Sequence, residues 1–282
     1  MISKRINIKF LRLIFFALIL FIFFFTLNFF KNDKLSIFKR CYLPKINLIP
    51  NNSIVVIGHA YGSPEDVSKE SYLSNKVQNF LNENRKKISK VIFTGDIFWE
   101  PSLNKWDRLY KDFKDDFSID IAPGNHEFDN LSKIDVLKMS QFRVEDFYEI
   151  KNTDKNLYLI ENSIINNWEL NNNMIKYINQ SVFDEFMIFR HNIPIIELVK
   201  LANSKSLMSD NLSSVLDIHE KFSKNKKITI ISGDGGAFKE LPRLICYEYK
   251  NFKFIINGIG NYNNDQILIL SKNNMHYYIL KN

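Results

Sequence analysis

Five clusters of glycine, histidine, aspartate and asparagine are spaced along the chain, each directly after a short apolar run. They lie at residues 58–62 (GHAYG), 95–96 (GD), 124–127 (GNHE), 191–192 (HN) and 233–236 (GDGG). Carboxylates, imidazoles and amide oxygens are ligands that suit divalent first-row metals, and glycine lets a tight loop bring its backbone close to a bound group. The residue types therefore predict a divalent-metal site.

The apolar runs before the clusters predict β-strands, and helical patterns separate some of them. Strands are expected at residues 53–57, 90–94, 117–121, 157–161, 185–189 and 228–232, and helices at 67–87, 172–179 and 215–222. In the tail, runs at 244–249, 252–257, 266–270 and 276–280 are separated by short polar turns, which predicts antiparallel hairpins. Loops after strand carboxyl ends gather the chemistry of open α/β sheets, so we expect the clusters to meet.

In order and context the clusters resemble the five motifs of the calcineurin-like metallophosphoesterases: GDxHG, GDxxx, GNHE, a lone histidine and GHxH. The resemblance runs from residue 53 to residue 262, and the GNHE tetrapeptide after a strand is its strongest part. It implies an α/β fold, a two-sheet β-sandwich flanked by helices. It also implies hydrolysis of a phosphoester by a metal-activated water.

The resemblance implies one complete metal site. Its ligands would be Asp96, Asn125, His191 and Asp234, with Asp96 also bridging to a second metal. Asp234 stands where the family has the first histidine of GHxH, and an aspartate can ligate manganese, iron or zinc as well as histidine can.

The second metal site departs from the family pattern. His59 stands at the aspartate of GDxHG, Tyr61 at its histidine, and Gly236 at the second histidine of GHxH. His59 and Asp96 remain as ligands, with Tyr61 either a phenolate ligand or a substrate contact. So few ligands predict weak or absent occupancy. Alternatively, His59 is a hydrogen-bond donor to the phosphate and no ligand.

His126 is the expected catalytic residue, because in the resemblance it approaches the substrate and can protonate the leaving oxygen. Glu127 is expected to support the site from behind. Each residue taken alone also has a structural reading: Asp96 as a turn or N-cap residue, Tyr61 and Trp99 as packing. The joint order of five clusters favours the metal site. The alternative function is an inactive module of this fold that binds a phosphorylated or glycosylated envelope component.

The N-terminal region predicts an uncleaved membrane anchor. Residues 13–30 are apolar except for Thr26 and Asn28, and 18 residues at helical rise reach roughly 27 Å, close to a bilayer's hydrocarbon thickness. A basic flank (1–12) precedes this span, and no small-x-small cleavage site follows it. A linker (31–50) then leads to the metallophosphoesterase-like domain (51–282).

Four basic residues flank each side of the span, so the positive-inside rule does not choose its orientation. We expect the N-terminus in the cytoplasm and the domain outside it, because a first span with a basic head usually inserts that way. Cys41 and Cys246 could then pair, although two free thiols are equally open.

The net charge of +7 belongs to the N-terminal region. Residues 1–40 hold eight Lys or Arg and one Asp, whereas residues 41–282 hold 30 basic and 30 acidic side chains. The domain has no excess positive charge, which argues against nucleic acid as a partner. The expected partners are the membrane and a phosphoester substrate, either a small molecule or an envelope component.

Overall fold

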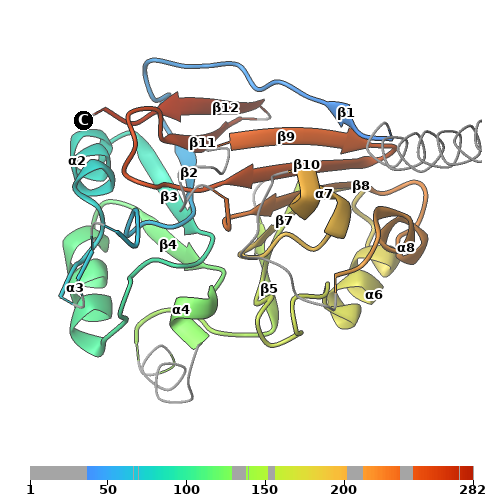
Figure 1. Ribbon diagram of the computed structural model, residues 1–282, viewed down its shortest axis with the longest axis horizontal. Helices are drawn as coiled ribbons and strands as arrows, with labels where there is room; N and C mark the ends of the chain where they lie inside the picture. The colour runs from blue at the N-terminus through green and yellow to red at the C-terminus, as the bar shows by residue number, and fades with distance from the viewer. Residues whose placement is uncertain are drawn as a thin grey trace, which may run out of the picture. The chain divides into compact units, whose positions relative to one another are not determined.

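The folded part of the chain is α/β, with two mixed β-sheets and helices beside them (Figure 1). The computed structural model describes residues 37–65, 67–68, 70–128, 138, 140–151, 156–201, 212–235, 244–272 and 274–281. The chain divides into two units, Met1–Lys39 and Arg40–Asn282, and nearly all described residues belong to the second. The predicted span 13–30 lies outside the described residues. None of the described helices is long and apolar enough to cross a bilayer.

The smaller sheet has five strands in the order β12-β11-β2-β3-β4. They are β2 (Ser53–Ile57), β3 (Ile88–Phe93), β4 (Ser118–Ile121), β11 (Gln266–Ser271) and β12 (Asn274–Ile279). β2, β3 and β4 are parallel, and β11 joins them antiparallel to β2. Helices α2 (Asn75–Asn84) and α3 (Leu103–Phe113) connect the parallel strands, as expected for right-handed crossover units.

The larger sheet has seven strands in the order β1-β9-β10-β8-β7-β6-β5. They are β1 (Lys39–Arg40), β5 (Phe147–Lys151), β6 (Asn156–Glu161), β7 (Glu185–Arg190), β8 (Lys227–Ser232), β9 (Leu244–Tyr249) and β10 (Phe252–Asn257). β6, β7, β8 and β10 are parallel neighbours, with β5 and β9 antiparallel beside them. The remaining helices are α4 (Asn125–Phe128), α6 (Asn172–Gln180), α7 (Ile196–Leu201) and α8 (Val215–Lys221).

The two sheets share a hydrophobic core. Alternate residues of β2 point to opposite faces: Val55 and Ile57 pack with α2 and α3, whereas Ile54 and Val56 pack with residues of the larger sheet such as Phe189. Both faces of β2 are therefore buried. This explains why its sequence is an unbroken apolar run and does not alternate.

Most predicted strands are confirmed to within two residues, and the tail forms two antiparallel hairpins, β9–β10 and β11–β12. The two hairpins lie in different sheets. The helix predicted at 67–87 is wrong in its first part, since α2 begins at Asn75. The Ser74 side chain accepts a hydrogen bond from the Val77 backbone N–H at 3.4 Å and so caps α2. The patterns did not predict β5, α3, α4 or α7.

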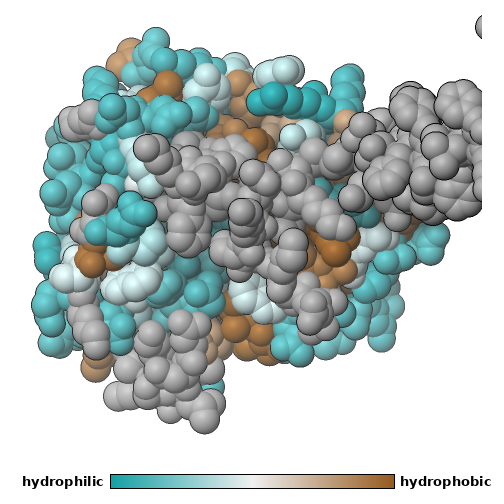
Figure 2. Space-filling model, in the orientation of Figure 1, coloured by the Kyte–Doolittle hydropathy of each residue, from teal (hydrophilic) through white to brown (hydrophobic). Residues whose placement is uncertain are grey.

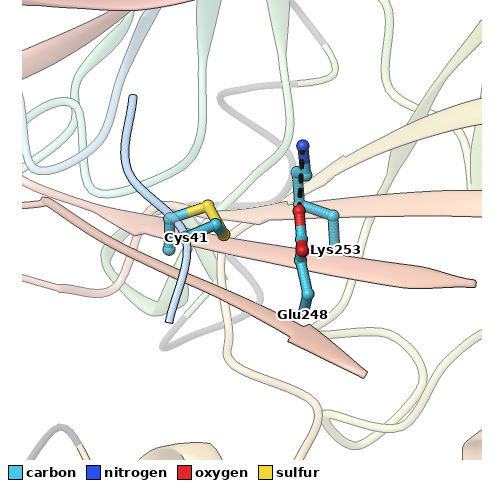
Figure 3. The surroundings of a disulfide bond; sticks show 4 residues. Cys41, Glu248 and Lys253 are labelled. Atoms are coloured by element: carbon cyan, nitrogen blue, oxygen red, sulfur yellow. Dashed lines mark ion pairs between the residues drawn. A yellow bond between two sulfur atoms is a disulfide. The ribbon is translucent and has the colours of Figure 1, made fainter. Parts of the chain in front are cut away.

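Cys41 and Cys246 form a disulfide, the alternative that the sequence had left open. Their Cα atoms are 5.0 Å apart, within the usual range for a disulfide. The bond ties the chain directly after β1 to β9, near the ion pair of Glu248 with Lys253 (Figure 3). Residues 40–50, predicted as part of the linker, thus belong to the second unit.

Replacing both cysteines by serine should lower the free energy of unfolding by about 2–5 kcal/mol, because the disulfide closes a loop of 205 residues and so constrains the unfolded chain. Urea unfolding of the full chain in detergent, followed by tryptophan fluorescence, measures the change. Wild-type protein unfolded in the presence of a reductant serves as the matched control and should show the same loss. Equal stability of all three samples would contradict the prediction.

Candidate metal centre

The five clusters meet where parallel strands of both sheets end. Asp96 follows β3 and Asn125 begins α4 after β4, both in the smaller sheet. His191 follows β7 and Asp234 follows β8 in the larger sheet, while His59 follows β2. The predicted convergence of the clusters is confirmed by the contacts among these five side chains.

His191 is fully buried, and its two ring nitrogens face different neighbours. Its Nδ1 lies 2.9 Å from the carbonyl oxygen of Thr94, which can only accept, so Nδ1 carries a proton. Its Nε2 faces Asn125 Oδ1 at 3.2 Å and Asp96 Oδ1 at 3.4 Å. Either a proton on Nε2 or a cation between the three atoms satisfies both oxygens. A backbone carbonyl behind a ligating histidine is also the usual way to fix its tautomer.

Asp96 lies between three histidines. Its carboxylate is 3.4 Å from His191, 3.7 Å from His59 and 3.9 Å from His126. Burial opposes ionisation of Asp96, but the three imidazoles outweigh it and hold the pKa below its usual range. His59, Asp96 and His191 offer ligand atoms that all lie within 4.8 Å of one another, so these three residues form a buried group at metal-binding distance.

His59 connects this group to Asp234. Its Nε2 is 3.3 Å from Asp234 Oδ1, and its Nδ1 is 3.3 Å from the Tyr61 hydroxyl. Burial raises the pKa of Asp234 to about 7, and the Asp96 carboxylate also raises it. Burial likewise raises the pKa of Tyr61, so its hydroxyl remains protonated and can donate to His59. These contacts place His59 among the candidate ligands, and its alternative role as a hydrogen-bond donor to the phosphate stays a prediction.

The structure groups His59 with Asp96 and His191. The resemblance assigned Asp234 to the complete site and His59 to its partner, whereas the buried three-residue group contains His59. The assignment of His59 and Asp234 to separate metals stays a prediction. Gly236, the third departure from the family pattern, lies outside the described residues.

His126 lies at the rim of the centre, with 15% of its side chain exposed. Its Nδ1 is 2.8 Å from the carbonyl oxygen of Trp99, so Nδ1 is the protonated nitrogen and Nε2 faces Asp96. The Trp99 ring lies 4.6 Å from the His126 ring, and Tyr61 contacts both rings. An aromatic wall therefore lies beside the most accessible imidazole of the cluster.

Glu127 fastens two of the clusters together. Its fully buried carboxylate accepts hydrogen bonds from the backbone N–H groups of Asp96, Ile97 and Gly124, at 2.8–2.9 Å. The loop after β3 is thereby fixed to the loop after β4. This geometry fits the predicted supporting role of Glu127 and brings Asp96 and Asn125 to the same place.

The loop backbones adopt unusual conformations at this point. His59 and Asp96 have φ angles of 50° and 55°, in the left-handed region that non-glycine residues rarely adopt. Such residues cluster at functional sites. Gly95 has φ 85°, and a Cβ there would collide with the His191 ring. Only glycine lets the loop after β3 pack against His191.

Two polar residues support the centre without having been predicted as site residues. The Ser163 hydroxyl donates to Asn192 Oδ1 at 2.8 Å, and Asn192 Nδ2 donates to Asp234 Oδ2 at 3.5 Å. Asn192 therefore fixes which carboxylate oxygen of Asp234 faces His59. Its place directly after His191 was a signal in the sequence. Ser163 follows β6, which carries no cluster, and offered none.

A cavity of about 630 Å³ lies elsewhere, at the amino ends of β7 and β8, and none of the centre's side chains lines it. It is lined by the ion pair of Glu185 with Lys227 among others, and it brings together no buried ligand group among the described residues. The chemistry of the chain therefore concentrates at the carboxyl ends of the strands.

No protein-family model matches the chain, and no curated protein matches its sequence.

Proposed function

We propose that this protein is a membrane-anchored, metal-dependent phosphoester hydrolase with the calcineurin-like metallophosphoesterase fold. The observation that carries the proposal is the convergence of His191 Nε2, Asn125 Oδ1 and Asp96 Oδ1: His191 Nε2 lies 3.2 Å from the Asn125 oxygen and 3.4 Å from the Asp96 oxygen. A divalent cation between these nitrogen and oxygen atoms would bind all three at once. The order of the motifs and the two-sheet α/β architecture support the choice of family.

Asp96, Asn125 and His191 would hold the metal, with His59 and Asp234 beside them. Manganese, iron and zinc all accept this set of oxygen and nitrogen ligands. When bound, such an ion polarises a phosphoryl oxygen and lowers the pKa of water. The low pKa of Asp96 supplies a negative charge at the centre, and Glu127 keeps the loops from separating.

His126 would protonate the leaving group. In hydrolysis the oxygen of water bonds to phosphorus, the ester P–O bond breaks, and the departing oxygen takes a proton. His126 Nε2 can donate that proton because the Trp99 carbonyl keeps Nδ1 protonated and turns Nε2 toward Asp96. The proton lost by the attacking water then returns to His126 Nε2 and restores the acid.

The location proposed for the domain is outside the cytoplasm, with residues 13–30 as the single span. The disulfide of Cys41 with Cys246 supports this location, because disulfides persist in oxidising compartments. The substrate would be a phosphoester, either a small molecule or an envelope component, and nucleic acid is not among the proposed partners.

The test is metal analysis and a phosphoesterase assay on the full chain purified in detergent. Elemental analysis should find about one tightly bound metal per chain, and hydrolysis of phosphomonoesters or phosphodiesters should depend on added manganese, iron or zinc. Bound metal without turnover would favour the binding module in place of the enzyme. Absence of metal under every loading condition would overturn the proposal.

Replacing His126 by alanine should lower kcat by about 10²–10⁴-fold, the usual contribution of a general acid, while metal content stays unchanged. The matched control is the same substitution at His219, which lies on α8 and packs against Tyr249 of β9. This control should leave the rate unchanged. Loss of metal from the His126 variant would show that His126 is a ligand and not the acid.

A further inference from the structure

Residues 40–49 are fastened to one edge of each sheet. The Cys41 N–H donates to the Cys246 carbonyl at 2.9 Å, beside the disulfide between these residues. Farther along, the backbone exchanges hydrogen bonds with Tyr277 of β12, through Ile46 N–H at 2.9 Å and the Pro44 carbonyl at 3.0 Å. In Figure 1 this blue segment runs from β1 along β9 and β12 toward β2. Its side chains are therefore held in fixed directions.

The inward side chains of the segment belong to the core. Cys41 and Leu43 pack against the cluster between the sheets, and Ile46 and Ile49 pack against the cluster beneath α2 and α3. These side chains stabilise the fold, since burial is what gives an apolar side chain its stabilising effect.

The outward side chains include large apolar groups that folding does not use. Tyr42 is 81% exposed, Leu48 77% and Ile37 41%. Single exposed apolar residues are common, and Figure 2 shows hydrophobic areas among mostly hydrophilic described residues. Among the described residues, however, only seven large hydrophobic side chains are exposed. Three of them fall within residues 37–48.

Basic side chains accompany these apolar groups. Lys39, Arg40 and Lys45 are exposed, and residues 37–49 contain no acidic residue. The Arg40 guanidinium lies 5.5 Å from the centre of the Tyr42 ring, so the aromatic and the cationic groups point the same way. Tyrosine and leucine interleaved with lysine and arginine are the residue types that bind the headgroup region of an anionic bilayer.

The length of chain before the segment favours the same occupant. Cys41 follows Phe30, the last residue of the apolar run, by eleven residues, a span of at most about 40 Å even when fully extended. The disulfide then fixes that point to β9. A bilayer holding residues 13–30 could not be far from this edge of the domain.

We propose that Arg40, Tyr42, Lys45 and Leu48 form a membrane-docking surface that rests on anionic phospholipid headgroups. The proposal rests on the anchor that is part of the proposed function, but not on hydrolysis. Because the disulfide and the hydrogen bonds to Tyr277 hold the segment rigidly, docking gives the domain one orientation toward the bilayer.

The test places the photo-crosslinker p-benzoylphenylalanine at position 42, 48 or 182 of the full chain in nanodiscs. Val182 is 92% exposed in the turn between α6 and β7 and is the matched control site. Mass spectrometry should find lipid adducts at positions 42 and 48 and few at 182. Changing Lys45 to Gln should lower the ratio of docked to undocked domain roughly fivefold in anionic nanodiscs, and should have little effect in zwitterionic ones.

The outcomes separate the proposals. Equal adducts at the three positions, or none at any of them, would overturn docking. Adducts with protein in place of lipid at 42 and 48 would also overturn it and identify the surface as a protein interface. Alkaline carbonate extraction of the same full chain reports on the anchor, and the phosphoesterase assay reports on catalysis. If the extraction shows no anchor, or the assay shows no hydrolysis, the crosslinking result can still be interpreted by itself.

Discussion

The Asp96→Asn variant is expected to lose its metal and to hydrolyse phosphoesters about a thousandfold more slowly. A bound metal supplies several kcal/mol of transition-state stabilisation, and each 1.36 kcal/mol is a factor of about ten in rate. Asp96 carries the negative charge at the point where His191, His59 and His126 meet. Asparagine has nearly the same shape but no charge. The variant therefore lacks the negative charge that would balance a bound metal ion.

Elemental analysis and kcat, measured on the same preparation, check this prediction. Asp116→Asn is the matched control, because it makes the same chemical change in a surface ion pair with Arg85. The control should keep both its metal and its activity. An Asp96→Asn variant with a full complement of metal would show that Asn125 and His191 suffice. In that case Asp96 would not be the bridging ligand.

The Arg190→Met variant is expected to lose about 3–5 kcal/mol of folding free energy, because it would leave Glu161 as an unpaired buried charge. Both side chains are fully buried, and Arg190 Nη1 lies 3.0 Å from Glu161 Oε2. Arg190 Nη2 also donates to the Trp168 carbonyl at 2.6 Å. Methionine fills similar space but supplies neither the charge nor the donor.

A double variant isolates the cost of the buried charge. In Arg190→Met with Glu161→Gln, the glutamine oxygen can still accept from the Asn171 backbone N–H, which donates to Glu161 at 2.7 Å in the native chain. Removing both charges should recover a substantial part of the lost stability in urea unfolding. If the single and double variants were equally unstable, the loss would come from packing or from the Trp168 contact, and not from an unpaired carboxylate.

The same pair lies beside the candidate metal centre along the chain. Arg190 is the last residue of β7 and directly precedes His191, while Glu161 ends the neighbouring strand β6, two residues before Ser163. The ion pair therefore joins the ends of two strands whose loops hold His191 and Ser163.

The sequence by itself indicated most of the strands and the clusters that would meet. Short apolar runs such as Ser53–Ile57 predict buried strands because a strand covered on both faces has no polar side. The clusters after these runs predict a common site, because parallel strands bring their carboxyl ends to the same edge. Asp96, Asn125 and His191 lie in these clusters, and the family resemblance singled them out as ligands. In the structure His191 Nε2 lies within 3.4 Å of an oxygen of each of the other two.

Only the tertiary structure decided how distant residues pair. His59 joins Asp96 and His191, Cys41 bonds Cys246 across 205 positions, and no local pattern encodes either distance. α2 begins at Asn75, later than predicted, and Tyr72 and Leu73 are buried ahead of the helix. The spacing of apolar residues in the sequence could not distinguish this burial from burial within the helix. Periodicity reports which side of an element is covered. What covers it depends on contacts between segments far apart in the chain.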